Sequence, residues 1–163
     1  MNAGDSAAPN DVWLRPITNE THIKRSVVHH GQFKKWLAPP DDPQKPWKLE
    51  LSGRLRSLVE SIAADALKKV KAQQDKLVTA NKPVPSALRY VGILHSTIED
   101  IRAIPELVGD VIYDPTEDNA HANIVVRDKG PNEILTVTDI LLKHLRFVEE
   151  SDVATHPEFS SCA

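Results

Sequence analysis

The segment spanning residues 89–127 constrains the fold most, because strand-forming and helix-forming stretches follow one another closely in it. Residues 88–94 form an apolar run that predicts a buried strand, and Ser96 and Glu99 have the spacing of a capping box that starts a helix. Two β-rich stretches, 110–113 and 122–126, come next. No glycine-rich phosphate loop follows any of these strands, so the order predicts an α+β fold rather than a parallel nucleotide-binding sheet.

Residues 52–80 have the pattern of a long amphipathic helix. Apolar residues recur at steps of three, four or seven, among them Leu55, Ile62 and Val70, and charged residues occupy the other faces. Such a helix would be about 42 Å long, which exceeds the diameter of a domain of this size. We therefore expect these three side chains to bind another protein or a second copy of the chain. The alternative is a long core helix with a frayed basic end.

The remaining patterns complete the expected architecture. Residues 12–17 predict a strand in which Pro16 favours an edge position or a strand end, and residues 29–37 predict a short helix. Residues 38–47 form a proline-rich connector, and Asn132 can cap a final helix. The expected fold is a small mixed or antiparallel sheet with the long helix and the C-terminal helix packed on one face. We expect a single α+β domain over residues 12–150, with disordered tails at 1–11 and 151–163.

Composition excludes several functional classes. The chain has 163 residues and a net charge of −3, so it lacks the basic surplus that makes nucleic acid a plausible partner. The single cysteine, Cys162, is expected to be an exposed tail residue, and one thiol fits a reducing cytoplasm. No apolar run reaches the length of about 20 residues that spans a bilayer, and the N-terminus has no signal-peptide pattern. We expect a cytoplasmic protein without membrane contact and without a cofactor.

The loop at residues 114–121 holds most of the polar residues that could carry chemistry. Its carboxylates, with Asn119 and His121, could bind a hard or borderline cation. Alternatively, Asp114 or Glu117 could orient His121 as a general base, with Arg15 as an anion contact. The simplest interpretation is a hairpin turn, because Asp-Pro and Asp-Asn are typical turn pairs. The pattern assigns no metal ligand to a particular residue.

The other histidines form no clear constellation. His22, His29 and His30 lie close in sequence, but neighbouring residues on a strand point to opposite faces and so seldom bind one ion. We expect His95 to be buried and hydrogen-bonded, and His144 to lie on the surface. The sequence contains no G-x-S-x-G, H-E-x-x-H or C-x-x-C motif.

The central segment is similar to a family of short bacterial proteins that have no established activity. The matching positions are Gly92, Ile93, Leu94, Thr97, Ile98, Val111, Asp114, Pro115, His121, Ala122 and Ile124. The chain departs from the family pattern by a longer insertion near 104–109 and a longer central helix. The resemblance implies a bacterial cytoplasmic protein with a functional Asp114 and His121, encoded near toxin or phage-defence genes. It implies no reaction.

Three functional hypotheses follow from these patterns. The leading one is a non-catalytic accessory protein that binds a larger assembly through the 52–80 helix. The second is a small hydrolytic or nucleotide-processing enzyme whose Asp114–His121 loop faces Arg15 or the region of His22 and His30. The third is an antitoxin-like inhibitor that uses the acidic loop to block a basic cleft.

Overall fold

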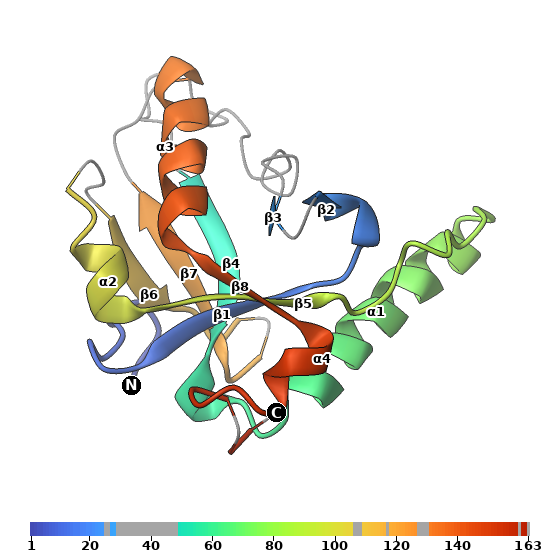
Figure 1. Cartoon of the computed structure of the whole chain (residues 1–163), viewed down its shortest axis with the longest axis horizontal. Helices are drawn as coiled ribbons and strands as arrows, with labels where there is room; N and C mark the ends of the chain where they lie inside the picture. The colour runs from blue at the N-terminus through green and yellow to red at the C-terminus, as the bar shows by residue number, and fades with distance from the viewer. Residues whose placement is uncertain are drawn as a thin grey trace.

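The structure is a computed structural model that describes residues 1–24, 27–28, 49–105, 109–116, 118–126, 131–159 and 161–162. A six-stranded sheet in the order β6-β7-β4-β1-β5-β8 forms its centre, and every neighbouring pair is antiparallel (Figure 1). These strands are β1 (Val12–Ile17), β4 (Leu49–Leu55), β5 (Gly92–Thr97), β6 (Gly109–Tyr113), β7 (His121–Val126) and β8 (Arg146–Glu149). The helices are α1 (Ile62–Thr79), α2 (Ile98–Arg102), α3 (Pro131–His144) and α4 (Glu150–Val153). The α+β prediction is therefore confirmed.

Smaller elements join these strands and helices. A 3-10 turn, η1 (Glu20–His22), precedes a two-stranded ribbon of β2 (Ile23–Lys24) and β3 (Val27–Val28), and a second 3-10 turn, η3 (Arg56–Leu58), follows β4. The predicted helix at 29–37 and the predicted connector at 38–47 lie outside the described residues.

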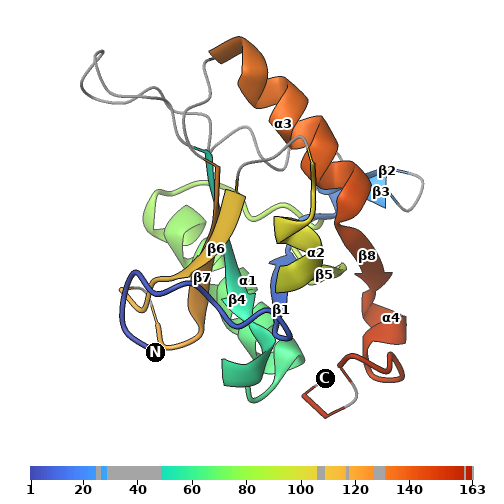
Figure 2. The ribbon, with the colours of Figure 1, turned by 90° about the vertical axis from the view of Figure 1, so that its left-hand side faces the viewer.

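Helices cover both faces of the sheet, which differs from the expected packing on one face. Figure 2 shows α1 on one side of the sheet and α2 and α3 on the other. One core joins Leu51 and Leu55 to residues of α2 and α3, and the other joins Leu14 and Ile93 to residues of α1 and α4. The reason is visible in β1, where all six residues are buried. A strand that is apolar on both faces needs a covering layer on each side.

The predicted helix at 52–80 is wrong in its first part. Residues 49–55 form β4, and α1 begins only at Ile62, after Ser61 accepts a hydrogen bond from the Ala64 amide as the N-cap. The 18 residues of α1 span about 27 Å at 1.5 Å per residue. Its C-terminal end still extends away from the sheet, at the right of Figure 1.

Because α1 is shorter than predicted, the side chains that were expected to bind a partner are not exposed. Leu55 and Ile62 are 0% exposed and Val70 is 7% exposed, because the chain's own cores cover all three side chains. They are therefore not available on the surface. The large apolar residues that α1 exposes are instead Leu67 and Val78, at 60% and 62%.

Both predicted tails pack against the sheet. The amides of Gly4 and Ala7 donate to the carbonyl oxygens of Tyr113 and Val111 on β6, at 2.9 and 2.8 Å. The N-terminal segment thus occupies the outer edge of β6, whose backbone groups would otherwise be unpaired. At the other end Phe159 is 0% exposed, and Cys162, expected to be exposed, is buried in the core beneath α1.

β1 lies inside the sheet, and Pro16 is the residue before its last, so the strand end and not the sheet edge is the position that this proline occupies. Pro16 would face Ser52 if the register of β1 and β4, which pairs Leu14 with Arg54, continued for two residues. Pro16 has no N–H to donate to the Ser52 carbonyl oxygen, and the guanidinium of Arg15 donates to that oxygen instead. The side chain of Arg15 thus replaces the missing ladder bond and keeps a proline-containing strand in the interior.

The start of α2 differs from the prediction by one residue. Ser96 is still part of β5, and the Thr97 hydroxyl caps the helix by accepting a hydrogen bond from the Asp100 amide at 3.1 Å. The strands predicted at 110–113 and 122–126 agree with β6 and β7 to within one residue at their starts. The final helix, α3, begins at Pro131, so Asn132 lies inside its first turn and not at the predicted cap position.

Candidate functional site

The pairing of β4 with β7 brings a serine and a histidine together. In this register Ser52 faces Asn123 and Arg54 faces His121, so the four side chains lie on one face of the sheet. The Ser52 Oγ atom is 2.8 Å from Nε2 of His121. Ser52 is partly exposed, whereas His121 is 4% exposed. Ser52 is thus the more exposed member of the hydrogen-bonded pair.

The other ring nitrogen of His121 contacts Asp114, which follows β6. Nδ1 is 2.7 Å from the backbone oxygen of Asp114 and 3.7 Å from its carboxylate Oδ2. Because a carbonyl oxygen only accepts, we assign the proton to Nδ1. Nε2 then carries the lone pair that accepts the hydroxyl proton of Ser52. This tautomer has the orientation that a general base needs.

The carboxylate of Asp114 is held in its ionised form. The Thr116 hydroxyl donates to Oδ1 at 2.7 Å, and the Thr116 amide donates to the same oxygen at 3.2 Å. These bonds, the hydroxyl first, lower the pKa of Asp114 below its usual value, against a smaller effect of burial, and protonation of His121 would lower it further. Asn123 Nδ2 also lies 3.4 Å from Oδ2. An ionised carboxylate beside Nδ1 stabilises a protonated imidazole.

Arg54 anchors the loop before β7 to α1. Its Nε atom donates to Asp65 of α1 at 3.0 Å, and its Nη1 atom donates to Asp118 in the loop. Burial alone would lower the pKa of Arg54, but the two carboxylates outweigh it and raise the pKa. Asp118 in turn accepts from the Ala120 amide at 2.9 Å. The network fixes the loop, and with it the position of His121.

The structure brings only some of the predicted residues together. Asp114 and His121 meet as the general-base hypothesis requires. Arg15 is 4% exposed and donates to the Ser52 carbonyl oxygen, so it is not placed to contact a dissolved anion. Asn119 is exposed, and it is its backbone oxygen that accepts the Tyr113 hydroxyl at 3.1 Å.

The remaining candidates lie elsewhere or cannot be placed. His22 is in η1, and His144 is exposed at the end of α3. Glu117, His29 and His30 lie outside the described residues. Within the part of the chain that the structure describes, no three His, Cys, Asp or Glu side chains come together as a possible metal site. No helix among the same residues is long and apolar enough to cross a membrane.

Ser52 and Asn123 were not among the predicted site residues. Their signal was the alternation of the two strands, in which polar residues at 50, 52 and 54 and at 121 and 123 share one face. Because residues 52–80 were interpreted as a helix, the alternation at 50, 52 and 54 was not recognised.

His95 belongs to a second buried cluster, on β5. Its Nδ1 atom is 2.9 Å from Glu158 Oε2, yet neither ring nitrogen makes a well-aligned hydrogen bond to the described residues. His156 and Phe159 pack against the ring at centroid distances of 5.3 and 4.8 Å. Burial, only partly offset by the Glu158 carboxylate, lowers the pKa of His95 to about 4. The imidazole is therefore neutral at pH 7, and it holds the C-terminal segment by packing.

Comparisons with protein-family models, with curated proteins and with solved structures gave no match. The class of the molecule is thus defined by its own geometry: an antiparallel sheet covered on both faces, with a Ser-His-Asp arrangement across β4, β7 and the end of β6.

Proposed function

We propose that the chain is a small hydrolase that cleaves ester bonds, with Ser52 as the nucleophile, His121 as the general base and Asp114 as the carboxylate that orients it. The observation that carries the proposal is the 2.8 Å contact between Ser52 Oγ and His121 Nε2, with Nδ1 held by Asp114 on the opposite side of the ring. These are the relations between nucleophile, base and orienting group that define such sites on unrelated folds.

The reaction would follow from this geometry. His121 Nε2 takes the hydroxyl proton while Ser52 Oγ bonds to the acyl carbon, and the imidazolium returns that proton to the departing alkoxide. Water then attacks the acyl-serine, giving its proton to His121, and Ser52 leaves with a proton restored. Asn123 is directly opposite Ser52 in the register, so its side-chain amide, which lies 3.4 Å from Asp114 Oδ2, is the donor that we propose for the oxyanion.

A fluorophosphonate probe tests the nucleophile without knowledge of the substrate. We expect one adduct on Ser52, located by peptide mass spectrometry, and loss of labelling in Ser52→Ala and in His121→Gln. Ser151→Ala is the matched control, because Ser151 is exposed and belongs to α4. Thermal unfolding establishes that each variant is folded.

Two outcomes would overturn the proposal. One is the absence of any Ser52 adduct in folded wild-type protein. The other is equal labelling of wild type and His121→Gln, which would mean that the imidazole does not activate the hydroxyl. The hydrogen bond would then only tie β4 to β7.

The second candidate function is that of an accessory protein that binds its partner through a different surface from the one expected. Leu67 and Val78 are strongly exposed and lie about three turns apart on α1, so they share one side of the helix. A cytoplasmic partner, protein or second copy, would bind this side. Sedimentation velocity of the chain, alone and mixed with the products of adjacent genes, tests it. A monomer in every mixture counts against it.

The inhibitor hypothesis has less support, because Asp114 and Asp118 are already engaged by His121 and Arg54.

A further inference from the structure

The large exposed apolar side chains of the molecule gather on one element. Among the residues that the structure describes, five such side chains are exposed, and all but Met1 lie on α1 or near its ends. These four are Leu58, Leu67, Val78 and Val84. Single apolar residues are normal on a protein surface, but their concentration along a helix that extends away from the sheet (Figure 1) is typical of a contact with another molecule.

The exposed side of α1 carries a stripe of four residues with an alternating character. At about 100° per residue, they fall within about 80° of one another around the helix axis: Leu67, Lys71, Asp75 and Val78. All four are strongly exposed, the two apolar side chains at 60% and 62% and the two charged ones at 73% and 63%. The buried residues of the helix lie on its other side. This α1 stripe therefore has an apolar residue at each end and an ion pair between them.

The α1 stripe is complementary to itself when it is reversed. The midpoint between Leu67 and Val78 and the midpoint between Lys71 and Asp75 both fall at residues 72–73. If two copies of α1 pack antiparallel about this point, Leu67 of each copy faces Val78 of the other, and each Lys71 faces Asp75. A two-fold axis requires such a pattern, because both copies then use the same surface. In a parallel pair, like charges would face each other at both charged positions.

The ion pair within the stripe is compatible with this contact. Lys71 Nζ is 2.9 Å from Asp75 Oδ2 of the same helix. A lysine ammonium has three donors, and a carboxylate has about four acceptor sites. Each group can therefore keep its partner within the helix and also bond to the opposite charge of the second copy. The contact does not depend on an unpaired charge, only on opposite charges meeting across the axis.

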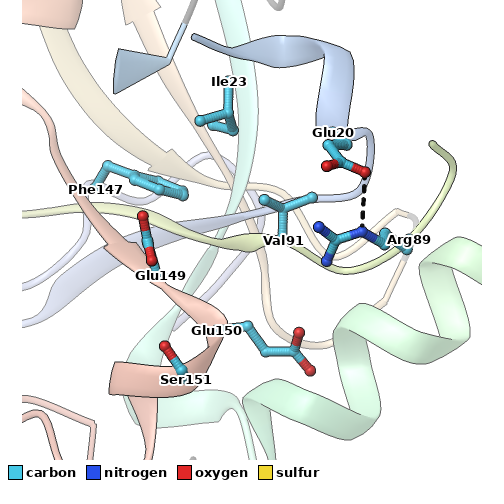
Figure 3. A pocket seen from close by; sticks show the side chains of 8 residues that line it. All are labelled: Glu20, Ile23, Arg89, Val91, Phe147, Glu149, Glu150 and Ser151. Carbon is cyan, nitrogen blue, oxygen red and sulfur yellow. Dashed lines mark hydrogen bonds and ion pairs between the residues drawn. The ribbon is translucent and has the colours of Figure 1, made fainter. Parts of the chain in front are cut away.

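A pocket of about 390 Å³ beside β8 is another surface that α1 of a second copy could contact (Figure 3). Charged residues of its lining already interact with one another: Arg89 Nε is 3.2 Å from Glu20 Oε2, and the charge of Glu150 also acts on Arg89. A helix seated there would make a heterologous contact, which continues from copy to copy instead of closing. The symmetric α1 stripe instead fits a closed dimer.

We propose that the α1 stripe binds a second copy of the chain, as an antiparallel pair of helices about a two-fold axis. The proposal rests on the second candidate function, whose exposed helix side it assigns to one partner, and it is independent of the Ser52 arrangement. Each helix contributes only about three turns, so the interface is small and the dimer is weak. We expect a dissociation constant on the order of 10–100 µM.

Sedimentation equilibrium of the full chain at about 10–500 µM should show a monomer–dimer equilibrium. Leu67→Gln should weaken the dimer at least about tenfold, because it removes an apolar contact at both ends of the interface. Lys71→Glu and Asp75→Lys should each weaken it at least about fivefold, because each places like charges opposite one another twice. An equimolar mixture of these two charge variants should restore the dimer, since every contact between 71 and 75 then joins opposite charges.

Lys143→Glu is the matched control, because it makes the same change of charge at an exposed lysine of α3, on the other side of the sheet (Figure 2). Its dimerisation should equal that of the wild type, and thermal unfolding establishes that every variant is folded. The proposal is overturned by a monomer at all concentrations, by association beyond the dimer, or by a mixture that associates no better than either charge variant alone. A chain that is monomeric alone but binds the product of an adjacent gene refutes the second copy and leaves the accessory function standing.

Discussion

The buried histidine of β5 makes the stability of the chain depend on pH in a defined window. Burial lowers the pKa of His95 from 6.5 to about 4 in the folded chain. Between these values the unfolded chain binds the proton and the folded chain does not, so acid favours unfolding. The full contribution is present above pH 6.5 and is lost progressively as the pH falls toward 4. At about 1.4 kcal/mol per unit, the difference reaches about 3 kcal/mol.

The charged and titratable groups around His95 are few. Glu158 favours its protonation, whereas Arg146 and His156 oppose it. Glu158 alone would raise the pKa of His95. Burial of the ring, which is 1% exposed, outweighs this effect. The sign of the prediction depends on this balance. If the ion pair dominated, acid would stabilise the chain instead.

Urea unfolding at pH 7 and pH 4.5 measures the effect, with the fluorescence of Trp13, which is 0% exposed, contributing to the signal. The free energy of unfolding of the wild type should fall by about 2–3 kcal/mol more than that of His95→Gln. His144→Gln is the control, because His144 is exposed at the end of α3. Equal pH dependence of wild type and His95→Gln would refute the reasoning, and so would a wild type that is more stable at pH 4.5.

Three further substitutions have defined outcomes. Phe159→Ala should lower the free energy of unfolding by about 3–5 kcal/mol in urea titrations, because the ring is fully buried; a change below about 1 kcal/mol would mean that the C-terminal segment is not docked. Gly53→Ala should destabilise by at least about 1–3 kcal/mol and change the fluorescence spectrum, because a Cβ there would overlap the Trp13 ring. Arg54→Ala should cost about 2 kcal/mol and slow fluorophosphonate labelling, because it frees the loop that positions His121; unchanged labelling would contradict that link.

The parts of the fold that sequence predicted are those in which local patterns agree with one another. β6, β7 and α3 combine a clear period with turn or capping residues at their ends, and the structure has them almost where they were expected. Asp114 and His121 lie together, as one of the alternatives for this loop required, because the hairpin between β6 and β7 places them side by side. Contacts between residues that are this close in sequence follow from the turn alone.

The parts that sequence missed depend on distant contacts. Residues 4–7 and Phe159 are ordered by a strand edge and by a core that form only when the whole sheet is assembled. The same holds for Pro16, whose position inside the sheet requires Arg15 to replace its missing donor. Neither the polar composition of the tails nor the presence of a proline carries that information.

The error at residues 52–80 and the failure to see Ser52 have one cause. Leu51 and Leu55 lie four residues apart, a spacing that fits one face of a helix and equally one face of a strand, where residues two and four apart also align. Tertiary contacts make the segment a strand rather than a helix, because β4 completes the ladder between β1 and β7. Once the segment is a strand, Ser52 turns away from the apolar core and toward His121, 69 residues further along. The chemistry proposed for this chain therefore depends on a register that only the assembled sheet defines.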